Sequence, residues 1–101
     1  MGIDVHLQNE SGADLRSYFD SQMLLPTMLD AFDTSKTTCL RFIDPYGDTT
    51  FNREQVEVLL IELSQLRDRL DTKTREFVDS IIELGEEVQS GNHLYLKFIG
   101  D

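Results

Sequence analysis

The side chains best suited to binding or catalysis are gathered in one short segment, 44–48, with the sequence DPYGD. It places two carboxylates, Asp44 and Asp48, on either side of a phenol, Tyr46. Carboxylates bind the cationic groups of basic proteins and hard metal ions, and tyrosine is a common anchor in protein interfaces. The proline presets φ for a turn and Gly47 can adopt a positive φ, so this composition predicts a tight acidic turn.

Calcium binding is one alternative for this turn, because residues 44–55 have the length of an EF-hand loop. The pattern departs from that loop where the chemistry is strict. Thr49 stands where the loop needs glycine, and Gln55 stands where it needs a bidentate glutamate. Only Asp44 and Asp48 remain, so the alternative is a weak divalent-cation site, and we expect no dedicated metal site and no cofactor.

Patterns of nucleophilic catalysis are missing from the sequence. It has no GxSxG, CxxC or P-loop motif, and Cys39 has no histidine near it in the chain. The other soft metal ligands, His6 and His93, occur singly, which disfavours zinc. We therefore expect that the protein is not an enzyme.

The chain is strongly acidic, with a formal net charge of −10 over 101 residues. A field of that sign repels nucleic acids and anionic lipids and attracts basic proteins. We therefore expect a basic protein partner, with no binding to nucleic acid or to membranes. A second group of acids, Glu83, Glu86 and Glu87, lies on one predicted helix, where a cationic partner would relieve its repulsion. The alternative is an ordinary solvated helix face.

The predicted location is a reducing cytoplasm. The single cysteine excludes an intramolecular disulfide. Residues 1–6 lack the basic and apolar segments of a secretory signal. No apolar run approaches the roughly 20 residues that are needed to span a bilayer.

Hydrophobic periodicity predicts the strands that position these groups. Strands are predicted over residues 3–8, 15–20, 37–43, 49–51 and 93–99. The segment 37–43 is rich in β-branched and aromatic residues, and 49–51 is expected to pair back on it across the acidic turn. The last strand is expected at the centre of the sheet.

Helical spacing predicts one short and two long helices. The short helix lies within 21–32 and has Pro26 in its first turn, where the missing N–H is tolerated. The first long helix is capped by Asn52, with Gln55 completing a capping box, and the second starts at 71–72. Gly85 lies in the apolar stripe of the second and predicts close contact between the two long helices.

These elements predict a single α+β domain over residues 1–101. Its expected architecture is a small antiparallel or mixed sheet of about four to five strands. A pair of long antiparallel helices is expected to pack on one face of that sheet, because the link between them is short.

The segment 40–52, LRFIDPYGDTTFN, together with the start MGIDV and the ending YLKFIGD, resembles a group of small, uncharacterised, acidic bacterial proteins. Their general style is similar to that of immunity proteins from bacterial toxin–immunity systems, which are short, acidic, cytoplasmic α+β domains. The resemblance does not cover residues 9–36. It implies a protein that neutralises a toxin, and it transfers no functional residues.

The residues and the resemblance together predict a non-catalytic, immunity- or antitoxin-type inhibitor. It would neutralise a basic effector, of which a nuclease is one candidate, by occluding the active site with an acidic surface. The expected contact residues are Asp44, Tyr46, Asp48, Glu83, Glu86 and Glu87. The alternative is a small self-associating accessory or structural domain. In that case a second copy would pack against Val58 and Ile61 or against the last strand, so homodimerisation is a further expectation.

Overall fold

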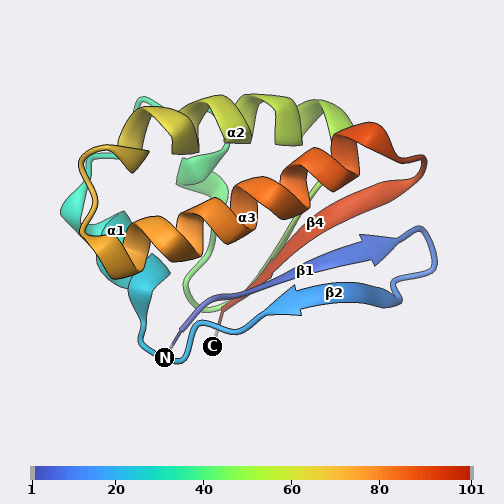
Figure 1. The fold of residues 1–101 in the computed structure, drawn as a ribbon, viewed down its shortest axis with the longest axis horizontal. Helices are drawn as coiled ribbons and strands as arrows, with labels where there is room; N and C mark the ends of the chain where they lie inside the picture. Colours follow the sequence, from blue (N-terminus) through green and yellow to red (C-terminus); the bar gives the residue numbers. More distant parts are fainter. Residues whose placement is uncertain (1, 101) are drawn as a thin grey trace.

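The computed structural model describes residues 2–100, which form a four-stranded antiparallel sheet and three α-helices (Figure 1). The strands are β1 (Asp4–Asn9), β2 (Asp14–Tyr18), β3 (Asp48–Phe51) and β4 (Leu94–Ile99). The helices are α1 (Leu24–Ala31), α2 (Arg53–Arg67) and α3 (Thr72–Ser90). The strand order is β2-β1-β4-β3, and every neighbouring pair is antiparallel. The predicted α+β class is confirmed, and the last strand lies inside the sheet as expected.

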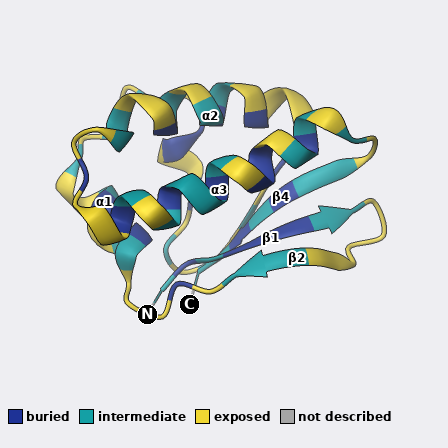
Figure 2. Ribbon diagram, viewed as in Figure 1, coloured by how far each residue is buried: buried dark blue, intermediate teal, exposed yellow. Residues whose placement is uncertain are grey.

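The core lies between the sheet and the helices. In Figure 1 the helices form a layer above the strands; α3 contacts β1, β2 and β4, and α2 contacts β3 and β4. Figure 2 shows that the buried positions of the helices alternate with exposed ones along their length. The fully buried side chains of the core include Ile3, Val5, Leu25, Leu40, Val56, Leu59, Leu63, Val78, Ile81, Leu84, Val88, Leu96 and Phe98. Among residues 2–100, no helix is long and apolar enough to cross a membrane.

Both long helices begin at the residues that the sequence predicts. Asn52 accepts a hydrogen bond from the Gln55 backbone N–H, and the Gln55 side chain accepts one from the Asn52 N–H, which completes the capping box. Asp71 caps α3 by accepting from the Thr74 N–H at 2.8 Å. The predicted short helix is also present as α1, with Pro26 in its first turn.

The prediction of a strand over 37–43 is wrong. Leu40–Phe42 instead forms one turn of 3₁₀-helix. The backbone N–H groups of residues 38–40 all donate to the carboxylate of Glu62 in α2, at 2.5, 3.0 and 3.1 Å. A β-rich composition favours a strand only when a neighbouring strand supplies acceptors, and here one carboxylate supplies them. Accordingly β3 pairs with β4 and does not fold back on 37–43.

The same segment contains the single cysteine. Cys39 is buried, and its burial raises the pKa of the thiol, with the nearby Glu62 carboxylate adding to the effect. A thiol with a raised pKa is a poor nucleophile at neutral pH. Cys39 is therefore a packing residue of the core.

Gly85 allows α2 and α3 to approach each other closely. A Cβ atom at this position would lie 2.6 Å from Cδ2 of Leu60 in α2, so only a residue without a side chain fits without a shift. The expected close helix contact at Gly85 is confirmed. Further along, Arg67 donates to both carboxylate oxygens of Asp79, at 2.5 and 2.9 Å, and joins the two helices at their surface.

We expect the substitution Asp79→Asn to alter the pH dependence of stability. The Arg67 guanidinium holds the pKa of the Asp79 carboxyl below its ordinary value. A lowered folded-state pKa stabilises the fold above the unfolded value near 3.9, and this contribution is lost as the pH falls through the folded value. The side chains are 39% and 42% exposed, so solvent screens the pair and the expected loss in melting temperature at pH 7 is only about 2 °C.

Thermal unfolding of the wild type and Asp79→Asn between pH 2 and pH 7 tests this expectation. The difference in melting temperature should shrink as the pH falls below about 4. Glu86→Gln, which removes an exposed carboxylate on the same helix, serves as the control and should show no such trend. A difference for Asp79→Asn that is constant with pH would contradict the assignment.

Candidate functional site

The acidic turn predicted from the sequence lies at one end of the sheet. Asp48 is the first residue of β3 and pairs with Ile99, the last residue of β4. Tyr46 projects from the turn with 84% of its surface exposed. Phe42, just before the turn, is also exposed, and the Arg41 guanidinium lies 4.7 Å from the centre of its ring.

Hydrogen bonds hold the backbone of this turn. The Asp44 carboxylate accepts from the Tyr46 N–H at 2.9 Å, and the Asp44 carbonyl accepts from the Gly47 N–H at 3.4 Å. The Thr49 hydroxyl accepts from the Asp44 N–H and donates to the Phe42 carbonyl, both at 3.1 Å. The turn is therefore fixed from both sides before any partner binds.

The glycines of this region are explained by close approach. Gly47 does not adopt a positive φ, contrary to the expectation, and a Cβ there would lie 2.7 Å from a carboxylate oxygen of Asp44. The Gly100 N–H donates to the Gly47 carbonyl at 2.8 Å. A Cβ on Gly100 would lie 2.4 Å from the Pro45 carbonyl, so the end of β4 packs directly on the turn.

The two acids of the turn have different environments. Asp44 directs one oxygen to the backbone of its own turn, whereas Asp48 lies 3.5 Å from the Lys97 ammonium. An ammonium beside Asp48 disfavours a metal ion there. Among residues 2–100, no three His, Cys, Asp or Glu side chains are grouped as metal ligands. With Lys97 and Arg41 nearby, the surface around Tyr46 is mixed in charge rather than uniformly acidic.

The second acidic group already has a cationic partner within the chain. Arg16 of β2 donates to Glu87 at 2.5 Å and to Glu83 at 2.9 Å. These carboxylates, Glu83 most strongly, raise the pKa of Arg16 above its ordinary value. Glu86, between them in sequence, is exposed. Sequence periodicity places the three acids on one helix, but only the packing of β2 against α3 brings Arg16 to two of them.

The six residues predicted as contacts do not form one site. The turn lies beside the last residue of β4, whereas Glu87 lies near the end of α3, which leads into the first residue of β4. The two groups are therefore separated by roughly the length of a six-residue strand, about 20 Å.

The face of the sheet turned away from the helices is a surface that sequence analysis did not single out. β2 and its extension place Leu15 and Phe19 there, and Phe19 is 68% exposed. Its ring meets the His6 ring edge-on, with centroids 5.9 Å apart. The alternation within 15–20 does put these side chains on one face. That no helix among residues 2–100 covers them is visible only in the fold (Figure 1).

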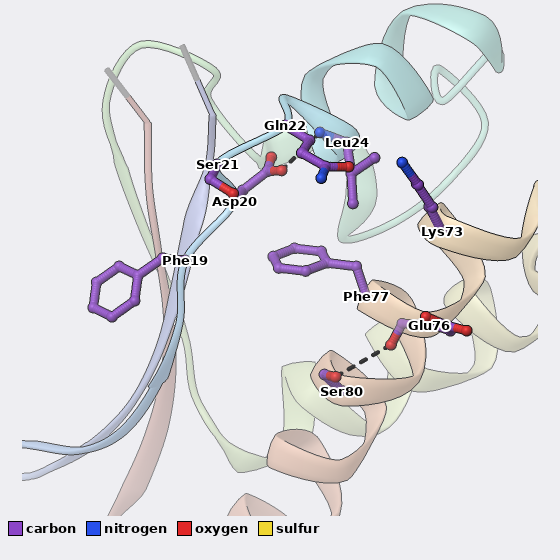
Figure 3. Close-up of a pocket in the computed structure, with 9 residues that line it drawn as sticks. All are labelled: Phe19, Asp20, Ser21, Gln22, Leu24, Lys73, Glu76, Phe77 and Ser80. Carbon is purple, nitrogen blue, oxygen red and sulfur yellow. Dashed lines mark hydrogen bonds between the residues drawn. The ribbon is translucent and has the colours of Figure 1, made fainter.

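A hollow of about 410 Å³ lies where the segment 19–24 faces the first half of α3 (Figure 3). Phe77 points into it, whereas the Phe19 ring points to the other side of the strand. Asp20 accepts from the Leu24 N–H at 2.7 Å, and the Ser80 hydroxyl donates to the Glu76 carbonyl at 3.1 Å. The Asp20 and Ser80 side chains are therefore engaged with backbone groups, and the charged side chains of Lys73 and Glu76 also line the hollow.

A shallow groove of about 640 Å³ runs between α2 and α3. It is lined by Glu57, Leu60, Ile61, Ser64, Gln65, Ile82, Glu86 and Gln89. Ile61 is 56% exposed in it, whereas Val58 packs against the core. Val58 therefore belongs to the buried face of α2, whereas Ile61 belongs to its surface.

No protein-family model, curated protein or solved structure matches this chain. The resemblance of the segment 40–52 to proteins in the style of toxin immunity proteins thus stays an expectation. The surfaces described above are the basis for inferring a function.

Proposed function

We propose that this protein is a non-catalytic, immunity- or antitoxin-type inhibitor of a basic effector, of which a bacterial nuclease is one candidate. The observation that carries the proposal is Tyr46, which is 84% exposed at the tip of a turn fixed by hydrogen bonds. Tyrosine supplies much of the energy of many interfaces. An anchor on a preorganised turn loses little conformational entropy when it binds.

The charge of the chain supports a basic partner. A net charge of −10 would accelerate the approach of a cationic surface and make association sensitive to salt. At the turn, Asp48 is only 3.5 Å from Lys97 in a partly exposed pair, so a partner's arginine can compete for it. Asp44, Tyr46 and Asp48 form the first contact surface in this proposal, and Glu83, Glu86 and Glu87 form a second, separate one.

The proposal also includes the arrangement of the two long helices and the cellular location that the sequence predicts. In this arrangement α2 and α3 act as a pair of long antiparallel helices packed on one face of the sheet. The Leu60–Gly85 approach and the Arg67–Asp79 pair support this arrangement. The predicted location is the cytoplasm, which the single, buried Cys39 supports because a reducing compartment leaves such a thiol free.

A second candidate function is self-association as a small structural domain. The exposed Leu15 and Phe19 on the uncovered face of the sheet favour it, because apolar side chains on a free sheet face are readily buried by a second copy. Sedimentation equilibrium tests it. A dimer mass in the wild type that Phe19→Ser reduces to a monomer would favour this candidate over the inhibitor.

We expect Tyr46→Ala to weaken partner capture without changing stability. The test uses wild type, Tyr46→Ala and Phe19→Ala as baits in lysate of the source cell, followed by calorimetric titration of the captured protein. Tyr46→Ala should weaken the Kd by about 30-fold, corresponding to a loss of about 2 kcal/mol, and should leave the melting temperature unchanged. Phe19→Ala is the matched control, because it also removes an exposed aromatic ring but lies outside the turn.

Salt gives the second arm of this experiment. Binding of a basic effector should weaken strongly between low and high salt, because charge steering contributes to association. Equal capture by Tyr46→Ala, or capture only of proteins indifferent to salt, would overturn the proposal.

A further inference from the structure

The groove between α2 and α3 combines an apolar floor with acidic walls. Leu60 and Ile61 of α2 and Ile82 of α3 supply the apolar side chains. Glu57 of α2 and Glu86 of α3 supply two carboxylates, and no lysine or arginine lines the groove.

The contact between the helices places both carboxylates toward the same end of the groove. Leu60 lies against Gly85, so Glu86 is next to this contact on α3, and Glu57 is about one turn before it on α2. The other end is lined by neutral side chains, which include Ser64 and Gln65. A cationic side chain bound at the first end would lie between two walls of like charge and relieve their repulsion.

We propose that this groove docks a basic amphipathic helix of a partner protein. The lining of α2 runs from Glu57 to Gln65, about 12 Å of helix, which matches about two turns of a docked helix. Such a helix would place apolar side chains at i, i+4 and i+7 on the floor of the groove. A lysine or arginine beside the first of them would meet Glu57 and Glu86.

Charge complementarity selects this occupant over a second copy of the chain. In a two-fold dimer the same patch meets itself, and because its charged lining consists of Glu57 and Glu86, a second copy would bring no cationic group to them. The rest of the chain is acidic as well, with a net charge of −10. A basic helix buries the same apolar floor and neutralises the walls. The groove shares Glu86 with the second contact surface proposed above, but it is separate from the first, because the groove is on the helices and the turn of Tyr46 is at the end of the sheet.

The test uses a fluorescein-labelled peptide of about 16 residues, with leucine at i, i+4 and i+7, lysine and arginine beside them, and alanine elsewhere. A peptide of the same composition in scrambled order is the control for general electrostatic attraction. Binding is measured by fluorescence anisotropy with the full-length protein. The patterned peptide should bind at least about tenfold more tightly than the scrambled one.

Three variants locate the binding on the protein. Ile61→Ser and Glu86→Lys should each weaken the patterned peptide at least about tenfold, because they remove the floor contact and reverse the wall charge. Glu76→Lys is the matched control, since it reverses an exposed charge on the same helix outside the groove, and it should change the affinity less than about threefold. Melting temperatures check that every variant is folded.

Several outcomes would overturn this inference while leaving the Tyr46 proposal untouched. One is equal binding of the patterned and scrambled peptides. Another is a loss in Glu76→Lys as large as that in Glu86→Lys, which would indicate long-range charge alone. A third is a wild-type dimer that Ile61→Ser converts to a monomer, which would assign the groove to a second copy of the chain.

Discussion

Replacing Asp20 by alanine is expected to lower the free energy of unfolding by about 3 kcal/mol. Asp20 is only 3% exposed, and its carboxylate accepts hydrogen bonds from the backbone N–H groups of Ile3, Leu24 and Leu25, at 3.1, 2.7 and 3.0 Å. It thereby joins the residue before β1 to the first turn of α1. Met23 occupies the N-cap position of that helix but makes no side-chain cap bond. Asp20 supplies the acceptors that an N-cap side chain normally provides.

The size of this effect follows from the burial of the donors. Hydrogen bonds to a charged group contribute roughly 1.5–3 kcal/mol each, and a buried N–H left without an acceptor adds a desolvation cost. Relaxation and water entry reduce the sum, so about 3 kcal/mol is expected out of a typical total of 5–15 kcal/mol. Asp20→Asn keeps one oxygen acceptor in the same place and should lose about half as much.

Urea unfolding of the purified variants measures these differences. Asp30→Ala is the control, because it removes an exposed carboxylate on α1 and should change stability by less than about 0.5 kcal/mol. The same result for Asp20→Ala would show that the carboxylate is not needed to join β1 and α1. Since Asp20 also lines the hollow of Figure 3, its replacement should alter the NMR resonances of Phe77 across that hollow.

Replacing Glu62 by alanine is expected to loosen the backbone of the segment 37–43 and to lower stability by about 2 kcal/mol. The Glu62 carboxylate accepts from three consecutive backbone N–H groups, those of residues 38–40. Without it, these donors lose their acceptors on α2. The segment lacks the ladder bonds of a strand, so Glu62 holds its backbone to α2, while the buried Cys39 and Leu40 hold it to the core.

Trypsin provides a direct measurement, because Lys36 and Arg41 are potential cleavage sites within or beside the segment. Glu62→Ala should be cut at these positions at least about tenfold faster than the wild type under native conditions. Glu62→Gln, which retains one acceptor oxygen, should be intermediate. Glu57→Ala, an exposed site on the same helix, is the control and should match the wild type. Wild-type cleavage rates in Glu62→Ala would refute this role.

This prediction also bears on the proposed function. The Phe42 carbonyl, near the end of the segment 37–43, accepts a hydrogen bond from the Thr49 hydroxyl, which holds the acidic turn. Loosening 37–43 would therefore loosen the support of Tyr46, and partner affinity should fall even though Glu62 is distant in sequence. Tyr46→Ala would weaken the same binding with no change in the trypsin rate. This difference distinguishes Tyr46, which contacts the partner, from Glu62, which only holds the backbone behind the turn.

Local sequence patterns were sufficient to predict the helices and strands that depend on residues close together in the chain. The Asn52–Gln55 capping box and the Asp71 cap depend on residues three apart, so the sequence predicts where α2 and α3 begin. Strands β1 and β4 follow from alternation, because one face of each carries core side chains, whereas in β2 the apolar Leu15 lies on the exposed face. Gly85 likewise indicated a close contact, since glycine within an apolar stripe is otherwise unfavourable.

The pairing of distant side chains could be read only from the fold, because it depends on which elements become neighbours. Glu62 turns a β-rich segment into a 3₁₀ turn from more than 20 residues away. Arg16 forms ion pairs with Glu83 and Glu87, which the sequence predicted as contacts for a partner protein. The acidic, aromatic turn was predicted from its own residues, although Thr49 and Gly100 also hold it in the structure. Its separation from the second acidic group, and the exposure of the helix groove and the sheet face, follow from the packing of the helices on the strands.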